Sequence, residues 1–88
     1  MAELSLAELL RVHEAAERFE TAWRRGDRPR IEQFLDGLPP ALRDEVLKTL
    51  IEIEIELRRG GRNPATRAEF ERRFPGYLKI VAAVFREC

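Results

Sequence analysis

Ile53-Glu54-Ile55-Glu56-Leu57-Arg58-Arg59-Gly60-Gly61-Arg62 decides the fold of this chain, because the same pattern stands 34 positions earlier as Phe19-Glu20-Thr21-Ala22-Trp23-Arg24-Arg25-Gly26-Asp27-Arg28. Five of the ten positions are identical, and two more keep a large apolar residue. A repeat of about this period usually marks a supersecondary unit that cannot bury its apolar face alone. We therefore expect a single domain over residues 1–88, in which two such units bury each other in an approximate two-fold arrangement.

The first unit carries clear helix signals. Ser5 and Glu8 have the spacing of a capping box, and apolar residues follow at steps of three and four. Gly26 is placed to end the helix in a left-handed conformation. The pattern predicts a helix over 6–25, followed by a short helix within 29–37.

The segment 51–57 alternates apolar and acidic residues and, taken alone, is typical of a half-buried strand. A helical stripe begins well before this alternation, at Leu42, Val46, Leu50, Ile53 and Leu57. The repeat also aligns the segment with the end of the first long helix. We therefore predict a helix over about 40–59, with a broad apolar face and a central position.

Thr66 and Glu69 repeat the capping-box spacing ahead of a second short helix, and a last amphipathic helix follows. The predicted fold is all-α, a compact five-helix bundle in the order long, short, long, short and final helix. It derives from an internal duplication of a helix, a turn and a short helix. The repeat units span about 5–38 and 40–75, and the C-terminal helix spans about 76–87.

Composition excludes several classes of protein. Sixteen basic and sixteen acidic residues cancel, so the chain has no overall field to hold a polyanion. Cys88 is the only cysteine and His13 the only histidine, so neither an internal disulfide nor a metal site is expected. No apolar run approaches the roughly 20 residues that span a membrane, and the N-terminus lacks the positive start of a signal peptide. We expect a cytoplasmic domain, either free-standing or part of a longer protein.

The repeated polar residues suggest a structural role. Glu20 and Glu54 are equivalent, and Glu54 falls inside the apolar arc of its helix, where a carboxylate needs a partner. Arg28 and Arg62 follow at one fixed spacing, just past the turn glycines. We hypothesise that each glutamate anchors the following turn, through an arginine fork or through backbone N–H groups of the loop. The alternative is that both glutamates lie at the wet edge of the arc.

Two groups of residues are candidates for contact with a partner. They are Tyr77, Ile80 and Val84 on the final helix, and Arg24, Arg25, Arg58 and Arg59 at the ends of the long helices. Such arginines could hold the phosphates of a nucleic acid or of a phosphorylated partner. Helix C-termini also attract arginine for dipole reasons alone.

Catalytic motifs are absent from the sequence. Ser5 is the only serine and is committed to capping, and there is no phosphate-binding loop or nucleophile with a matching base. We therefore expect no enzymatic activity and no cofactor.

The pattern Phe19-Glu20-x-x-Trp23-x-x-Gly26-x-Arg28-Pro29-x-Ile31-Glu32-x-Phe34-Leu35 resembles the helical region ahead of the catalytic domain in many bacterial serine/threonine protein kinases. The second half is similar to the same region, in Leu50 through Arg58 followed by Gly61, Pro64, Phe70 and Arg73-Phe74-Pro75. The resemblance covers about residues 15–85. It implies an accessory module, since the chain has no glycine-rich nucleotide loop, catalytic lysine or H-R-D motif.

Three functions remain as hypotheses. The first is a non-enzymatic interaction or regulatory module of bacterial signalling, monomeric or weakly homodimeric, with a kinase domain in cis or a signalling partner in trans. The second is a small nucleic-acid-binding or transcription-regulating protein that uses the arginine-rich helix ends, although the zero net charge disfavours a nucleic-acid partner. The third is a purely structural spacer. We expect no membrane partner.

Overall fold

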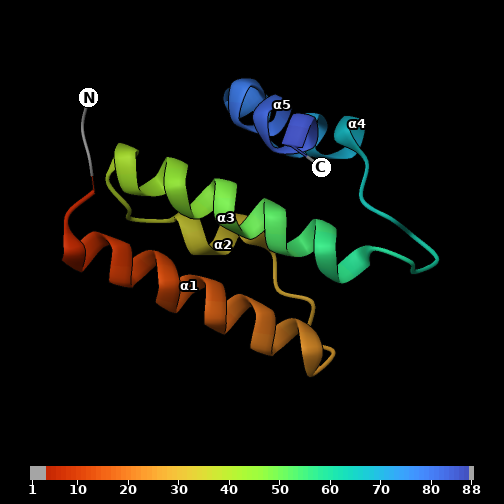
Figure 1. The fold of residues 1–88 in the computed structure, drawn as a ribbon, viewed down its shortest axis with the longest axis horizontal. Helices are drawn as coiled ribbons and strands as arrows, with labels where there is room; N and C mark the ends of the chain where they lie inside the picture. The colour runs from red at the N-terminus through yellow and green to blue at the C-terminus, as the bar shows by residue number, and fades with distance from the viewer. Residues whose placement is uncertain (1–3, 88) are drawn as a thin grey trace.

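Helices account for most of the computed structural model, which describes residues 4–87 (Figure 1). In chain order they are α1 (Leu6–Arg24), α2 (Ile31–Leu35), α3 (Pro40–Arg58), α4 (Arg67–Arg73), a 3₁₀ turn η1 (Pro75–Tyr77) and α5 (Leu78–Glu87). The described chain contains no strand, so the predicted all-α five-helix bundle is confirmed. Cys88 lies outside the described residues. No helix within residues 4–87 is long and apolar enough to cross a membrane.

The predicted start of α1 is present in full. Ser5 Oγ accepts from the Glu8 amide at 3.1 Å, and the Ser5 amide donates to Glu8 Oε1 at 2.9 Å. This reciprocal pair satisfies two of the backbone donors that a helix start leaves open. At the other end, Gly26 has a φ of 92°, and the Asp27 amide donates to the Ala22 carbonyl at 3.0 Å. Local chemistry therefore fixes both ends of the helix.

The ambiguous segment 51–57 is helical and forms the C-terminal half of α3. Ile51, Glu54 and Ile55 are buried, whereas Ile53 is only partly buried. A spacing of three and four residues between the buried positions is that of a helix face, not of a strand. The predicted central position of this helix is also confirmed, since α3 packs against α1, α2 and α5.

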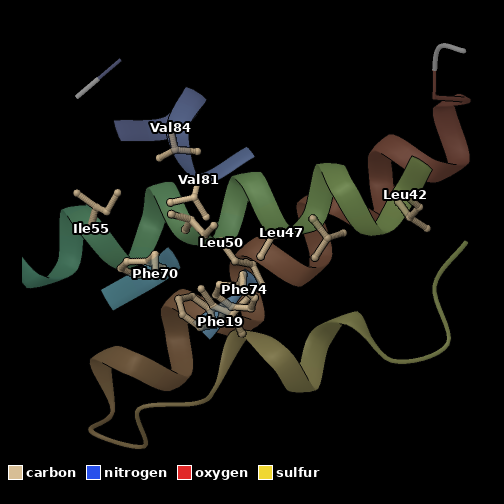
Figure 2. Packing of buried hydrophobic residues seen from close by; sticks show 12 residues of the cluster. Phe19, Leu42, Leu47, Leu50, Ile55, Phe70, Phe74, Val81 and Val84 are labelled. Atoms are coloured by element: carbon tan, nitrogen blue, oxygen red, sulfur yellow. The ribbon is translucent and has the colours of Figure 1, made fainter. Parts of the chain in front are cut away.

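The core gathers around α3 (Figure 2). Helix α3 contributes Leu42, Val46, Leu47, Leu50, Ile51 and Ile55, and the other helices add Phe19, Ile31, Phe70, Phe74, Val81 and Val84. Aromatic contacts connect neighbouring elements. The rings of Phe19 and Phe34 join α1 to α2 with centroids 5.7 Å apart, and those of Phe70 and Phe85 join α4 to α5 at the same separation.

Helix α3 lies between α1 and α5. Helices α1 and α3 lie side by side and run in the same direction (Figure 1). The short helix α2 packs on α3, and the short helix α4 packs on α5. A two-fold relation would place α4 on α1 as α2 lies on α3, so the expected two-fold arrangement is wrong. The parallel course of α1 and α3 brings the turns 25–30 and 59–66 to the same end of the molecule.

Candidate functional site at the repeated turns

A buried ionic network lies beneath the second turn. The Glu54 side chain is 4% exposed, and its Oε2 accepts from Arg58 Nη1 at 2.9 Å and from Arg73 Nη1 at 3.0 Å. Two guanidinium groups therefore compensate one buried carboxylate. The buried charge of Glu54 is therefore paired, as burial of a carboxylate requires.

Arg58 connects this carboxylate to the turn. Its guanidinium donates to both oxygens of Glu69, each at 2.7 Å, and its Nε donates to the Asn63 carbonyl at 2.9 Å. The hydrogen bonds from Arg58, opposed in part by burial, hold the pKa of Glu69 below its usual range. The turn 59–66 is thus pinned to α3 and α4 by a single side chain.

Glu54 binds arginines other than the one that the sequence predicted. Its partners are Arg58 and Arg73, so the expected pairing with Arg62 is wrong. Arg58 lies one helical turn after Glu54 on the same face of α3, whereas Arg62 is exposed beyond the end of the helix. The anchoring also acts on loop carbonyls, not on the N–H groups that we considered.

Arg73 extends the network to α2. Its Nη2 lies 3.4 Å from Glu32 Oε1, and its guanidinium lies over the rings of Phe70 and Phe74 at 4.7 and 5.2 Å. Burial raises the pKa of Glu32, but a hydrogen bond from its own backbone and the Arg73 guanidinium outweigh burial and lower it. One set of charges therefore joins α2, α3 and α4.

The network is suited to holding structure, not to moving protons. The pKa values of Glu32 and Glu69 are lowered, and those of Arg58 and Arg73 are raised. These four groups keep their charge near neutral pH, and a general acid or base needs a pKa near the working pH.

The first unit lacks this network. Glu20 pairs with Arg24 at 2.7 Å on the surface, and its side chain is 42% exposed. Arg28 makes no hydrogen bond to Glu20, and its guanidinium instead lies 5.4 Å from the centre of the Trp23 ring. The predicted anchoring of the first turn by Glu20 and Arg28 is therefore wrong.

A comparison of the two units explains the difference. With Phe34 aligned to Phe70, the positions of Glu69 and Arg73 are occupied in the first unit by Gln33 and Gly37. These residues supply neither the carboxylate nor the guanidinium that the network needs. The sequence therefore carries a signal for Glu69 and Arg73: they are charged residues at positions where the first unit has an uncharged residue.

The predicted partner surface is largely used for folding. Val84 is completely buried, and the Arg58 side chain is 10% exposed, so neither is available to a partner. Ile80 is partly buried because the apolar face of α5 turns towards α3. Tyr77 is also partly buried, but it lies in η1 and not in the final helix as predicted. Arg24, Arg25 and Arg59 are exposed as expected, each within 3.4 Å of a carboxylate on its own segment.

A groove between α1 and α2 was not predicted. It measures about 440 Å³, and its lining residues are Arg11, Glu14, Ala15, Arg18, Pro29, Gln33, Phe34, Leu38, Leu42 and Val46. A second hollow of about 460 Å³ continues it along α1 and shares Arg18 and Phe34. The spacing of Arg11, Arg18 and Arg25 by seven residues was the sequence signal for this surface, since that spacing returns to one side of a helix.

Helix α1 also exposes leucines at its N-terminal end. Leu6 is 75% exposed and Leu10 is 55% exposed. Leu10 lies one helical turn before Glu14, so it borders the Glu14 edge of the groove, and Leu6 lies one turn further towards the N-terminus. Within the described part of the chain no other element packs over them.

Neither a metal-binding group nor a similar protein assigns a role to this chain. Among residues 4–87 there is no group of histidine, cysteine, aspartate and glutamate side chains that could hold a metal ion. No family model, curated protein or solved structure matches the chain.

Proposed function

We propose that this chain is a non-enzymatic helical module that binds a protein partner through the groove between α1 and α2. The observation that carries the proposal is the composition of the groove. Apolar side chains line it beside two arginines, Arg11 and Arg18, which have no hydrogen-bond or ion-pair partner elsewhere in residues 4–87. Glu14 is the only carboxylate of the described chain that lines the same groove, so the surface is cationic on balance.

This chemistry fits an amphipathic segment of a partner protein. Its apolar residues would cover Ala15, Phe34 and Leu38, and its acidic residues would face Arg11 and Arg18. An amphipathic helix in an apolar groove is a common mode of peptide recognition, and complementary charge sets its orientation.

The ionic network supports the proposal by fixing one wall of the groove. Helix α2 has only five residues, and a helix of that length is not stable alone. The Glu32–Arg73 contact and the burial of Ile31 hold it in place. A preformed wall lowers the entropy cost of binding.

The resemblance to the accessory region of bacterial serine/threonine kinases suggests the context. On this basis the partner is a kinase domain in cis or a signalling protein in trans, and the module positions or regulates it.

Peptide selection tests the proposal. A display library of helical peptides is selected on the immobilised chain, and the enriched peptides are titrated against the wild-type chain, Arg18→Glu and Arg72→Glu. Arg72 is the matched control, since it is an exposed arginine on α4 without a partner in the described chain. We expect acidic amphipathic peptides that bind Arg18→Glu at least about tenfold more weakly and Arg72→Glu equally well.

Amide shift mapping provides the second measurement. The selected peptides should shift the amide signals of Arg11, Ala15 and Gln33. Equal binding to wild type and Arg18→Glu, or shifts confined to another face, would contradict the proposal.

A further inference from the structure

The two repeated turns enclose a small hollow at the end of the bundle. It measures about 310 Å³ and combines Trp23 and Arg28 from the first turn region with Arg58, Gly61 and Arg62 from the second. Among residues 4–87, every charged side chain that lines it is an arginine. A hollow with only cationic side chains favours an anionic ligand.

Two of the three arginines are free to bind a ligand. Arg58 is saturated by Glu54, Glu69 and the carbonyls of Asn63 and Pro64. Arg28 and Arg62 have no hydrogen-bond or ion-pair partner among residues 4–87, and Trp23 orients Arg28 by the contact with its ring. Neither arginine anchors its turn, so turn formation does not account for them.

The backbone at Arg28 adds an independent observation. Its φ is 46°, and it is the only residue other than glycine with a positive φ in the described chain. A residue with a Cβ is disfavoured in this left-handed conformation. Such strain is often found where a side chain is held for binding.

The charge balance favours an anion despite the nearby helix ends. Helices α1 and α3 both end here, and each C-terminus carries about half a negative charge. Two full positive charges on Arg28 and Arg62 outweigh the sum of about one negative charge. Three carbonyls of the last turn of α1, those of Thr21, Ala22 and Trp23, also accept hydrogen bonds from the amides of Arg25, Asp27 and Gly26.

The surroundings limit the size of the anion. Arg24, Arg25 and Arg59 each lie beside a carboxylate, so no continuous cationic track leads away from the hollow. Polyanion binding requires many phosphate contacts. The surface instead offers two guanidinium groups, and these groups match the oxygens of one phosphate.

We propose that this hollow binds a single phosphate group, carried on a phosphorylated side chain or free in solution, between Arg28 and Arg62 and against Trp23. The site is separate from the groove between α1 and α2, and the proposal does not rest on partner binding there.

The fluorescence of Trp23 tests the site directly, because it is the only tryptophan of the chain. The probes are inorganic phosphate, N-acetyl-phosphoserine amide, the unphosphorylated serine amide and a duplex oligonucleotide, each titrated at low ionic strength. The variants are Arg62→Gln, Arg28→Asn and the control Arg72→Gln. Asparagine tolerates a left-handed backbone, so Arg28→Asn removes the charge while keeping the turn. Thermal melting of each variant verifies that it is folded.

We expect one or both phosphate probes to change the emission of Trp23 in a saturable way, and the serine amide to leave it unchanged. Arg62→Gln and Arg28→Asn should each weaken binding about tenfold or more, the loss typical of one charge-assisted contact, whereas Arg72→Gln should bind as the wild type does. Tighter binding of phosphoserine amide identifies a phosphorylated side chain as the ligand, and tighter binding of inorganic phosphate identifies the free ion. Both results support the site.

Three outcomes would overturn it. They are no saturable change with either phosphate probe, equal binding by folded Arg62→Gln and Arg28→Asn variants, and tighter binding of the oligonucleotide with steep salt dependence. Failure of the peptide experiment with Arg18→Glu leaves these results unaffected, because Arg18 does not line the hollow.

Discussion

Arg58 and Glu69 form a two-pronged contact across the second turn, in which Nη1 donates to Oε2 and Nη2 to Oε1, each at 2.7 Å. The same guanidinium binds the buried carboxylate of Glu54. Both turns contain a left-handed glycine, Gly26 or Gly60, and backbone hydrogen bonds at the helix end. The two turns therefore share a sequence pattern and this local closure, and only the second adds a buried side-chain network.

Replacing Arg58 by lysine should destabilise the chain although the charge is kept. An ammonium group cannot match both oxygens of Glu69 and reach the Asn63 carbonyl together. We expect Arg58→Lys to lower the free energy of unfolding by about 2 to 3 kcal/mol. Arg59→Lys is the adjacent control, since Arg59 is exposed and should change stability by less than about 0.5 kcal/mol. Urea unfolding of the two variants measures the difference, and equal midpoints would show that the fork contributes nothing.

Glu54 and Glu20 occupy equivalent positions in the repeat, but their replacement by glutamine should change stability by different amounts. Glu54→Gln leaves Arg58 and Arg73 without the carboxylate they share, and breaking a buried ion pair costs about 3 to 5 kcal/mol. Glu20→Gln removes only a surface pair with Arg24 and should cost less than about 1 kcal/mol. Thermal and urea unfolding test both. A Glu54→Gln chain that melts with the wild type would refute a stabilising role for the network.

Stability should fall in acid because of the network carboxylates. Hydrogen bonds from Arg58 lower the pKa of Glu69; for Glu32, burial acts in the raising direction but is outweighed by its backbone hydrogen bond and Arg73. Each group therefore binds fewer protons in the folded chain than in the unfolded chain, whose glutamates have a pKa of about 4.3. The stabilisation is present above that pH and is lost as the pH falls through the lower folded values.

The experiment compares urea midpoints of wild type and Glu69→Gln from about pH 7 down to about pH 3. The wild type should lose stability between about pH 5 and about pH 3, and Glu69→Gln should lose less over the same range. Parallel curves for the two chains would exclude Glu69 as a source of the pH dependence.

Sequence signals close to a helix end predicted the helices well. The Ser5–Glu8 capping box and the glycine after α1 are local features, and their chemistry works without knowledge of the rest of the fold. The segment 51–57 needed the repeat as well, because its alternation alone favours a strand. The boundaries of α1 and α3 differ from the predicted ones by no more than one residue.

Contacts between distant residues could not be predicted in this way. The partners of Glu54 include Arg73, which is 19 residues away on another helix, and only the packing of α4 brings them together. The apolar period of α5 likewise shows that one face is buried but not which neighbour covers it, so Val84 was assigned to the surface. The groove between α1 and α2 also has Leu42 and Val46 of α3 in its lining, so it depends on how three helices meet and cannot be read from any one of them.

Two alanine substitutions test whether the segment 51–57 is a helix or a strand. In a half-buried strand Ile51 and Ile53 would face the same side, whereas in α3 Ile51 is fully buried and Ile53 only partly. Ile51→Ala should therefore lower the free energy of unfolding by about 2 to 5 kcal/mol, and Ile53→Ala by clearly less, about 1 kcal/mol. Urea unfolding measures both, and equal losses would favour the strand pattern.

Arg28 should be replaceable without loss of stability. Its left-handed backbone costs about 1 to 2 kcal/mol for a residue with a Cβ, and its contact with Trp23 recovers about 0.5 to 1 kcal/mol at an exposed site. Asparagine adopts this conformation more readily, so Arg28→Asn should melt at or slightly above the temperature of the wild type. Arg28→Val is the matched opposite, since a branched Cβ strongly disfavours a positive φ and should lower the melting temperature. A large loss of stability in Arg28→Asn would mean that the arginine itself builds the turn, and its assignment to ligand binding would then lose its main support.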